Sequence, residues 1–261
     1  MINQIKHLVV NSISIKKRSA IAIRFLNSLG FGETNLEIES KFLSNFANKT
    51  HLEDFSILDV GSSVGAYAKK LVKQTDAKIV CFEPSVVAFK KSLENLEQEI
   101  KSLKVKVFNL GVIVNDGQFN PSEIFSTTLY TNEIGSDRAS LFSISSEGEK
   151  VNFIDCQTLN KYVDSKIVAI KLDIEGYELK LMKDLTSYLK DPDFVCLQFE
   201  FGVNTEKANV KFSDIFDYLI DLGFVIKRIS PRGVIDVPHY SPICEINWPT
   251  NYLAVKRDYV N

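Results

Sequence analysis

Histidine, cysteine and methionine are scarce in this chain of 261 residues, which has three, four and two of them. The cysteines stand far apart, so the paired spacing of a zinc site is missing and a disulfide framework is not expected. Cys81 and Cys196 lie within apolar, strand-like runs, as reduced core residues of a cytosolic protein do. With so few histidines, we expect no histidine-rich metal site.

The chain also lacks a large excess of either charge and a long apolar run. Its formal net charge is −2, which gives no overall attraction to nucleic acid, so no nucleic-acid partner is expected. No stretch reaches the length of a transmembrane helix and no signal-peptide pattern is found, which favours a cytoplasmic protein. The length suits one large domain, and a hydrophobic content of 45% is typical of a globular core.

The first 25 residues are basic, and no Asp or Glu precedes Glu33. Isoleucine and valine are interleaved with the cations, so one interpretation is an amphipathic helix that contacts an anionic membrane or an acidic partner. We prefer a helix that lies across the sheet with solvated lysines. Residues 1–50 are predicted to form an N-terminal helical extension, and 51–261 the main domain. The basic residues are Lys6, Lys16, Lys17, Arg18 and Arg24.

A strand, a glycine-bearing turn and a helix are predicted at residues 55–72. The apolar run from Ile57 to Val60 fits a buried strand, and Gly61 and Gly65 frame a sharp turn. Helical spacing of apolar residues begins directly after this turn. Such a unit opens a ligand-binding α/β sheet, in which backbone N–H groups and a helix N-terminus face the ligand.

Two acidic residues indicate which ligand this unit binds. Glu83 ends the second strand about 20 residues after the turn, where such units hold two ribose hydroxyls. Asp59 would repel a pyrophosphate but attract a ligand with an ammonium and a sulfonium, and S-adenosylmethionine has both groups and a ribose. Ser63 and Ala66 stand where a dinucleotide site would have glycines. In the competing interpretation, Asp59 and Ser62 cap the next helix and Glu83 is a solvated strand end.

Strands and helices alternate along most of the remaining chain. This pattern requires a mostly parallel sheet with helices on both faces and the ligand at the carboxyl ends of the strands. Residues 112–150 differ, because short apolar patches there suggest hairpins around a polar loop, 131–146. A loop of this length is often functional, although it can also be a plain surface loop. Its substrate-facing candidates are Arg138, Ser140 and Ser143.

A group of charged residues ends the predicted strand 166–172. In an extended chain, Lys171, Asp173 and Glu175 lie on one side. The two carboxylates could act as a general base for a hydroxyl, hold Mg²⁺, or bind the ammonium of the cofactor. Alternatively, Asp173 or Glu175 only caps the following helix and Gly176 permits the turn.

Four motifs together resemble those of the FkbM-type methyltransferases. The most specific is Lys-x-Asp-Ile-Glu-Gly-Tyr-Glu at 171–178, since the glycine turn is common among class I methyltransferases. The resemblance covers about residues 56–255 and departs from the family pattern at Ser62-Ser63, usually Ala-Asn, and at Asn160, commonly Asp. The other three motifs are Asp59-Val60-Gly61…Gly65, Phe82-Glu83-Pro84 and Asn109-x-Gly111.

The resemblance implies a Rossmann-like class I methyltransferase fold with a mostly parallel seven-stranded sheet. It also implies S-adenosylmethionine as cofactor and O-methylation of a hydroxyl, frequently on a sugar of a surface polysaccharide. Asp173 and Glu175 are the candidate base or metal ligands, and Glu200 and His239 are weaker acceptor-side candidates. Assigned to the cofactor are Asp59, Gly61, Ser62, Gly65, Glu83, Pro84, Asn109 and Gly111.

Two other functions stay open at this point. An NAD-dependent oxidoreductase acting on nucleotide sugars would use the same sheet and Glu83, although its glycines and a nearby Tyr-x-x-x-Lys pair are missing. A non-catalytic Rossmann-like domain would instead bind a partner through the basic N-terminal helix. The sequence does not identify the methyl acceptor, the need for a metal or the oligomeric state.

Overall fold

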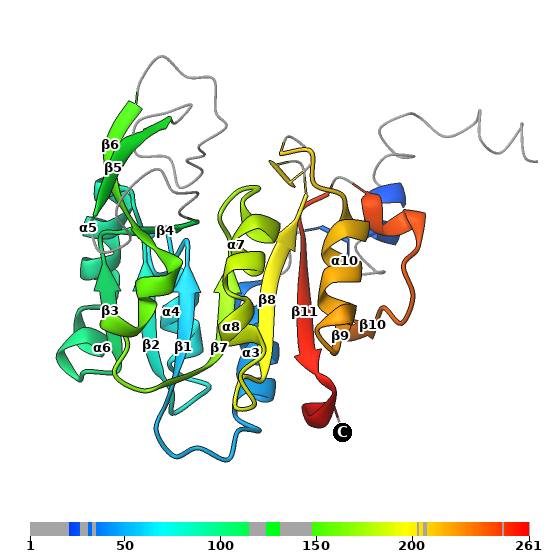
Figure 1. Cartoon of the computed structure of the whole chain (residues 1–261), viewed down its shortest axis with the longest axis horizontal. Coiled ribbons are helices and arrows are strands. Elements are labelled where there is room, and N and C mark those ends of the chain that lie inside the picture. Colours follow the sequence, from blue (N-terminus) through cyan, green and yellow to red (C-terminus); the bar gives the residue numbers. More distant parts are fainter. Residues whose placement is uncertain are drawn as a thin grey trace, which may run out of the picture.

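A computed structural model describes residues 21–26, 31–32, 35–114, 124–130, 148–202, 204–205, 208–246 and 248–260. These residues form a large twisted sheet with helices on both faces and a small second sheet beside it (Figure 1). The predicted loop residues Arg138, Ser140 and Ser143 lie outside the described ranges, as do Lys6, Lys16, Lys17 and Arg18. Within those ranges, no helix combines the length and the apolar character needed to cross a membrane.

The large sheet has eight strands in the order β10-β9-β11-β8-β7-β1-β2-β3. Five neighbouring strands of this sheet run parallel: β8, β7, β1, β2 and β3. Strand β11 runs antiparallel to both β8 and β9. The mostly parallel sheet is therefore confirmed. The strands are β1 Phe55–Val60, β2 Lys78–Phe82, β3 Val105–Phe108, β7 Lys166–Leu172, β8 Cys196–Phe201, β9 Phe224–Ser230, β10 Gly233–Asp236 and β11 Thr250–Lys256.

The expected number of strands, seven, is one too low. The additional strand is β10, which pairs antiparallel with β9 at the edge of the sheet. It has only four residues, and none of them is fully buried. A segment of four partly exposed residues is too short to show the apolar run by which a buried strand is predicted from sequence.

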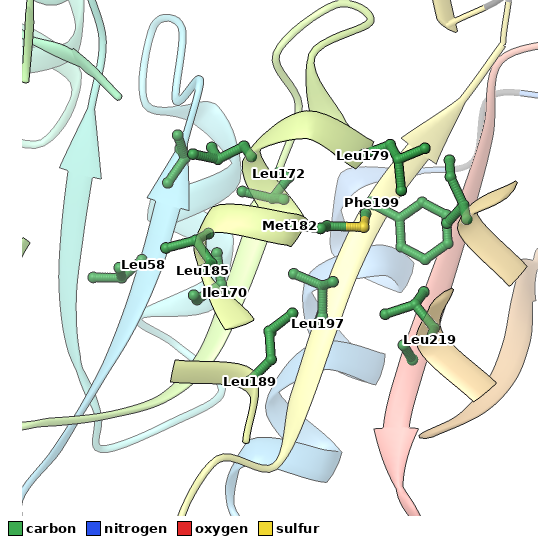
Figure 2. Packing of buried hydrophobic residues seen from close by; sticks show 14 of the residues in the cluster. Leu58, Ile170, Leu172, Leu179, Met182, Leu185, Leu189, Leu197, Phe199 and Leu219 are labelled. Atoms are coloured by element: carbon green, nitrogen blue, oxygen red, sulfur yellow. The ribbon is translucent and has the colours of Figure 1, made fainter. Parts of the chain in front are cut away.

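Helices cover the two faces of the sheet. One face lies under α3 and α4, and the other under α7, α8, α10 and the short helix η1. Figure 2 shows the second face. There Met182 of α7 and Leu185, the C-cap residue of this helix, pack against Ile170 and Leu197 of the sheet. The helices are α3 Leu36–Ala47, α4 Ala66–Leu71, α5 Val86–Asn95, α6 Glu97–Lys101, η1 Cys156–Lys161, α7 Glu178–Asp184, α8 Thr186–Leu189, α10 Phe212–Asp221, η2 Pro242–Glu245 and η3 Arg257–Tyr259.

The central strands are buried on both sides, which explains their continuous apolar runs. Every residue of β1 is buried, with Ile57 in the core under α3 and α4 and Leu58 in the core under α7. Successive side chains of a strand point to opposite faces, so most positions on both faces are apolar when both faces are covered.

The described part of the predicted N-terminal extension packs closely on the sheet. Leu43 of α3 is fully buried in the same core as Ile57. Further upstream, the Gly32 N–H donates to Thr250 Oγ1 at 3.2 Å, and the Arg228 guanidinium lies 3.8 Å from the centre of the Phe31 ring. A domain boundary near residue 50 stays a prediction, and α3 shares its core with the sheet.

The second sheet consists of β4 Gly111–Ile113, β6 Gly148–Asp155 and β5 Phe125–Tyr130, in that order. Strands β5 and β6 pair antiparallel, as the predicted hairpin requires. Gly111 has a packing reason here, because a Cβ atom at this position would lie 2.2 Å from the Phe153 ring. The structure gives Gly111 this role in the second sheet, and its assignment to the cofactor gains no support.

Candidate functional site

The carboxyl ends of β1, β2 and β7 are joined by backbone hydrogen bonds. Gly61 N and Ser62 N both donate to Phe82 O, at 3.0 and 3.1 Å, and Asp173 N donates to Val60 O at 3.0 Å. The glycine turn, the end of β2 and the Asp173 segment therefore lie side by side at one edge of the sheet. This is the edge at which open α/β sheets bind their ligands.

The two glycines of the turn are required by close contacts within the protein. Gly61 has a φ of 82°, and a Cβ atom there would lie 1.9 Å from Asp173 O. Gly65 has a φ of 75°, and its Cβ atom would lie 2.6 Å from a methyl carbon of Leu96. Any other residue would be strained in this conformation and would collide with these neighbours. The glycines thus bring the turn against β7 and α5, and their contact with a cofactor stays a prediction.

Glu83 connects the end of β2 to the glycine turn. Its carboxylate accepts hydrogen bonds from Ser63 N and Ser85 N, both at 2.8 Å, and its exposed fraction is only 7%. Burial raises the pKa of Glu83 to about 7, although the two N–H groups partly oppose this. Each carboxylate oxygen can accept a second hydrogen bond, so the predicted contact with ribose hydroxyls is compatible with this geometry.

Asn109 and Pro84 hold the loop that follows β2. The Asn109 side-chain amide donates to Glu83 O at 3.0 Å and to Pro84 O at 2.9 Å. At the same place Glu149 of β6 accepts from Val86 N, the first N–H of α5, at 2.9 Å. These contacts hold the loop beside Glu83. Asn109 therefore acts on the site through the backbone of this loop.

The Asp59 carboxylate, assigned to the cofactor from the sequence, is buried beside a lysine. Its side chain is fully buried, and its Oδ1 lies 3.5 Å from Lys171 Nζ. The register of β1 and β7 places these two residues opposite each other. Burial raises the pKa of Asp59, while the pKa of Lys171, lowered by burial, is raised above its ordinary value by Asp173 and Asp59. Asp59 thus lies beside a buried lysine that balances its charge, and its predicted contact with a cationic cofactor stays a prediction.

Lys171 sits in a buried polar layer below the strand ends. Its ammonium lies 4.9 Å from the centre of the Tyr67 ring. The Tyr67 hydroxyl donates to Gln198 Oε1 at 2.8 Å, and Gln198 Nε2 donates to Asn251 Oδ1 at 3.1 Å. Satisfied buried networks of this kind hold their members in one arrangement. The network therefore holds the Tyr67 ring beside the lysine.

Above this layer, three acids come together: Asp173, Glu175 and Glu200. Lys171 Nζ lies 3.0 Å from Asp173 Oδ2, and the Asp173 side chain is 37% exposed. The Asn204 amide donates to Glu175 Oε2. Burial, then the negative charges of Asp173 and Glu175, raise the pKa of Glu200 to about 9. The acidic cluster therefore includes Glu200 of β8 as well as the residues after β7 that the sequence analysis had singled out.

Glu178 organises this cluster, and the sequence analysis did not single it out. Its buried carboxylate accepts from Ile174 N at 3.0 Å and from Gly176 N at 3.0 Å. Burial raises the pKa of Glu178 to about 7. An acid in the first turn of a helix that reaches back to preceding N–H groups is a known sequence signal, so this role was accessible.

The structure does not bring His239 to the cluster. This residue is exposed in the segment after β10, and β9, β11 and β8 separate β10 from β7. Among the residues that the structure describes, no three His, Cys, Asp or Glu side chains are grouped so that they could hold a metal ion. The magnesium alternative therefore gains no support here.

The raised pKa of Glu200 predicts a pH-dependent stability. Between pH 4.5 and about 9 the folded protein keeps a proton that the unfolded chain has released, so the free energy of unfolding falls as pH rises. Above pH 7, Glu83 and Glu178 have largely ionised, and Glu200 dominates among these acids. We expect the free energy of unfolding of Glu200→Gln to fall less steeply with pH than that of the wild type, by about 1 kcal/mol per pH unit. Urea unfolding between about pH 7 and 8.5 measures this slope.

The matched control for this measurement is Glu94→Gln, which changes an exposed glutamate of α5. It should leave the slope of the wild type unchanged. A slope equally steep in Glu200→Gln would show that Glu200 is ionised in the folded protein at neutral pH.

Comparison with known proteins identifies the family. The Methyltransferase FkbM domain matches residues 59–226. The hexuronic acid methyltransferase AglP of Haloferax volcanii is 25% identical over 162 residues, which are 62% of this chain and 63% of that protein. The chain thus matches less than two thirds of this relative's length.

Several solved structures are also similar. A precorrin-6y C5,15-methyltransferase from Geobacter metallireducens has 11% identity and a TM-score of 0.43, over 82% of this chain and 86% of that one. A protein described as a putative rRNA methylase from Clostridium thermocellum has 10% identity and a TM-score of 0.46, over 86% and 98%. The family match, which covers the glycine turn, Glu83 and the whole acidic cluster, is the finding that assigns this chain. The chain belongs to the FkbM family of methyltransferases.

Proposed function

We propose that the protein transfers the methyl group of S-adenosylmethionine to a hydroxyl oxygen of a sugar, in a polysaccharide, a capsule or a nucleotide-sugar precursor. The observation that carries this proposal is the cluster of Asp173, Glu175 and Glu200 beside the glycine turn. Carboxylates at this edge favour a cationic cofactor and can take up the proton of a hydroxyl. The name of the archaeal relative, a hexuronic acid methyltransferase, supports a sugar acceptor.

The residues at the strand ends fit this cofactor by the chemistry of their donors and acceptors. Glu83 would offer its remaining acceptor positions to ribose hydroxyls, and the turn after Gly61 lies beside Glu83 because Ser63 N donates to its carboxylate. When bound, S-adenosylmethionine supplies an electrophilic methyl group on a sulfonium. Asp173 and Glu175 would supply negative charge at this edge of the sheet, where it would favour a cationic cofactor.

We assign the uptake of the hydroxyl proton to Asp173. The Lys171 ammonium lies 3.0 Å from one of its oxygens, Oδ2. The other oxygen can accept a hydrogen bond from the acceptor hydroxyl, and the partly exposed side chain can be reached from solution. This carboxylate would take up the hydroxyl proton while the oxygen–methyl bond forms, the sulfur–methyl bond breaks and S-adenosylhomocysteine is left.

The neighbouring acids position the hydroxyl. Glu200, with a pKa of about 9, is protonated at neutral pH and can donate a hydrogen bond. Glu175 has a φ of 57° and is held by Asn204. Because methyl transfer needs the oxygen in line with the S–CH₃ bond, most of the catalytic effect would come from such positioning.

Calorimetry with S-adenosylhomocysteine tests the cofactor site. Replacing Glu83 with glutamine removes a charged acceptor for the ribose hydroxyls, so we expect the affinity to fall at least about tenfold. The exposed Glu94→Gln in α5 is the control and should bind like the wild type. Unfolding curves of both variants show whether the fold is retained.

The same titration separates the alternatives. Binding of NAD without binding of S-adenosylhomocysteine would favour the oxidoreductase interpretation. Absence of binding to either nucleotide would favour the non-catalytic domain. Equal affinity of Glu83→Gln and wild type would remove Glu83 from the cofactor site.

A further inference from the structure

Strand β9 carries a charged residue in its core-facing series. Phe224 and Ile226 lie in the core under α7 and α10, and Arg228 is the next residue on the same side of the strand. Its exposed fraction is only 8%. Arginine is rarely buried to this extent unless it is paired with an acid. The position of Arg228 therefore needs an explanation beyond packing.

In the part of the chain that the structure describes, the Arg228 guanidinium has no acidic partner. It takes part in no ion pair there, and its buried Nε has no hydrogen-bond partner. Glu245 lies in the nearby helix η2, but its oxygens already accept from Phe212 N at 2.8 Å, Ser213 N at 3.0 Å and the Tyr240 hydroxyl. The positive charge of Arg228 is thus unpaired within the described residues.

The Tyr252 hydroxyl adjoins this guanidinium and is in the same situation. The register of β11 and β9 pairs the two residues, and the Tyr252 side chain is fully buried. Burial and then the Cys244 thiol raise the pKa of Tyr252, and the Arg228 charge partly opposes them. Among the described residues, the hydroxyl oxygen has no hydrogen-bond partner. If it accepted from the guanidinium, the hydroxyl proton and the positive charge would both still need an acceptor.

Phe31 packs on one face of the guanidinium. Its ring centre lies 3.8 Å from the guanidinium carbon, which is the distance of a stacked pair. The next residue, Gly32, donates from its N–H to Thr250 Oγ1, so this segment is held on the sheet. The N–H groups of a guanidinium point outward in its plane, and a ring on its face does not use them. Phe31 therefore orients the arginine without satisfying its donors.

A phosphate group matches this pair of donors. Buried polar groups without a partner are rare in folded proteins, and a ligand that completes them is one explanation. Phosphate carries negative charge and several acceptor oxygens, so it can accept from the arginine fork and also from a hydroxyl. A carboxylate has only two oxygens, which the fork alone would occupy.

We infer that Arg228 and Tyr252 form a binding site for a phosphate group, either free or in a phosphate ester. Strand β9 runs parallel to β8, because both are antiparallel to β11. Arg228, near the end of β9, therefore lies toward the same edge of the sheet as the carboxyl end of β8. The inference does not depend on methyl transfer, and neither residue belongs to the proposed cofactor site.

Titration of the full chain with inorganic phosphate, followed by ³¹P NMR, tests this site. We expect Arg228→Met to weaken phosphate binding at least about tenfold, because a charged hydrogen-bond donor is lost. Tyr252→Phe removes only the hydroxyl and should weaken binding about fivefold. The control is Arg232→Met, which removes an exposed arginine from the turn after the same strand and should bind like the wild type.

Thermal unfolding gives a second measurement. Phosphate should raise the Tm of the wild type and of Arg232→Met above the value in chloride at the same ionic strength, because it binds only the folded protein. It should leave the Tm of Arg228→Met unchanged. If Arg228→Met does not fold, the loss of phosphate affinity in Tyr252→Phe decides.

Two further probes identify the ligand class. Tighter binding of glucose 1-phosphate than of inorganic phosphate would assign the site to a phosphorylated sugar, and equal or weaker binding to free phosphate. Acetate binding as tightly as phosphate, equal phosphate affinity of the wild type and both site variants, or equal Tm values in phosphate and chloride would overturn the site. Binding of S-adenosylhomocysteine, measured on the same samples, tests the proposed function separately.

Discussion

Replacing Asp173 with asparagine is expected to lower kcat by about 10²–10⁴-fold, the usual contribution of a general base. The amide cannot take the proton of the hydroxyl, whereas its size and its backbone N–H bond to Val60 O are unchanged. Because Glu83 and the glycine turn are untouched, the affinity for S-adenosylhomocysteine should change little. Steady-state kinetics and calorimetry on one preparation measure both quantities.

Two variants complete this experiment. Asp221→Asn changes an exposed aspartate at the end of α10 and should have wild-type kcat. Glu175→Gln should reduce kcat less than Asp173→Asn, because Glu175 positions the hydroxyl in this account. The reverse order would transfer the base to Glu175, and normal turnover in both variants would exclude the cluster from the chemistry.

Replacing Lys171 with methionine is expected to destabilise the fold by about 3–5 kcal/mol, the cost of removing one partner of a buried ion pair. The fully buried Asp59, 3.5 Å from the ammonium, would lose its countercharge. Its pKa, already raised by burial, would rise further. Urea unfolding at neutral pH measures the change.

The structure supplies a matched control in the same strand. Lys166→Met also removes a lysine from β7, but its partner Asp191 is at the surface, so the expected loss is below about 1 kcal/mol. The double variant Asp59→Asn/Lys171→Met should recover part of the stability, because no buried charge is then left unpaired. If Lys171→Met and Lys166→Met cost the same, the Asp59 pair does not stabilise the fold.

Most of the fold was predictable because the central strands are rich in apolar residues. Buried on both faces, β1 and β7 give continuous apolar runs that end in polar residues. The edge strand β10 is short and partly exposed, so its four residues give no such pattern.

The candidate site was predictable only in part. The cluster at 173–175 could be found because its carboxylates are close in the sequence. The pairing of Asp59 with Lys171 depends on the register of β1 and β7, which are far apart in the chain, and the sequence does not give that register. The same holds for Glu200, which reaches the cluster through the neighbouring strand β8. Histidine is a common general base, but His239 follows β10, and three strands separate β10 from β7.

One measurement tests the central claim most directly. The wild type is incubated with S-adenosylmethionine carrying a ¹³C-labelled methyl group and with p-nitrophenyl β-glucuronide as a sugar acceptor, and the products are examined by NMR and mass spectrometry. The account predicts a labelled O-methyl ether on the sugar and an equal amount of S-adenosylhomocysteine, with both formed at least about 100-fold more slowly by Asp173→Asn. A labelled methyl group on nitrogen or carbon of the product, or equal turnover by Asp173→Asn, would contradict it.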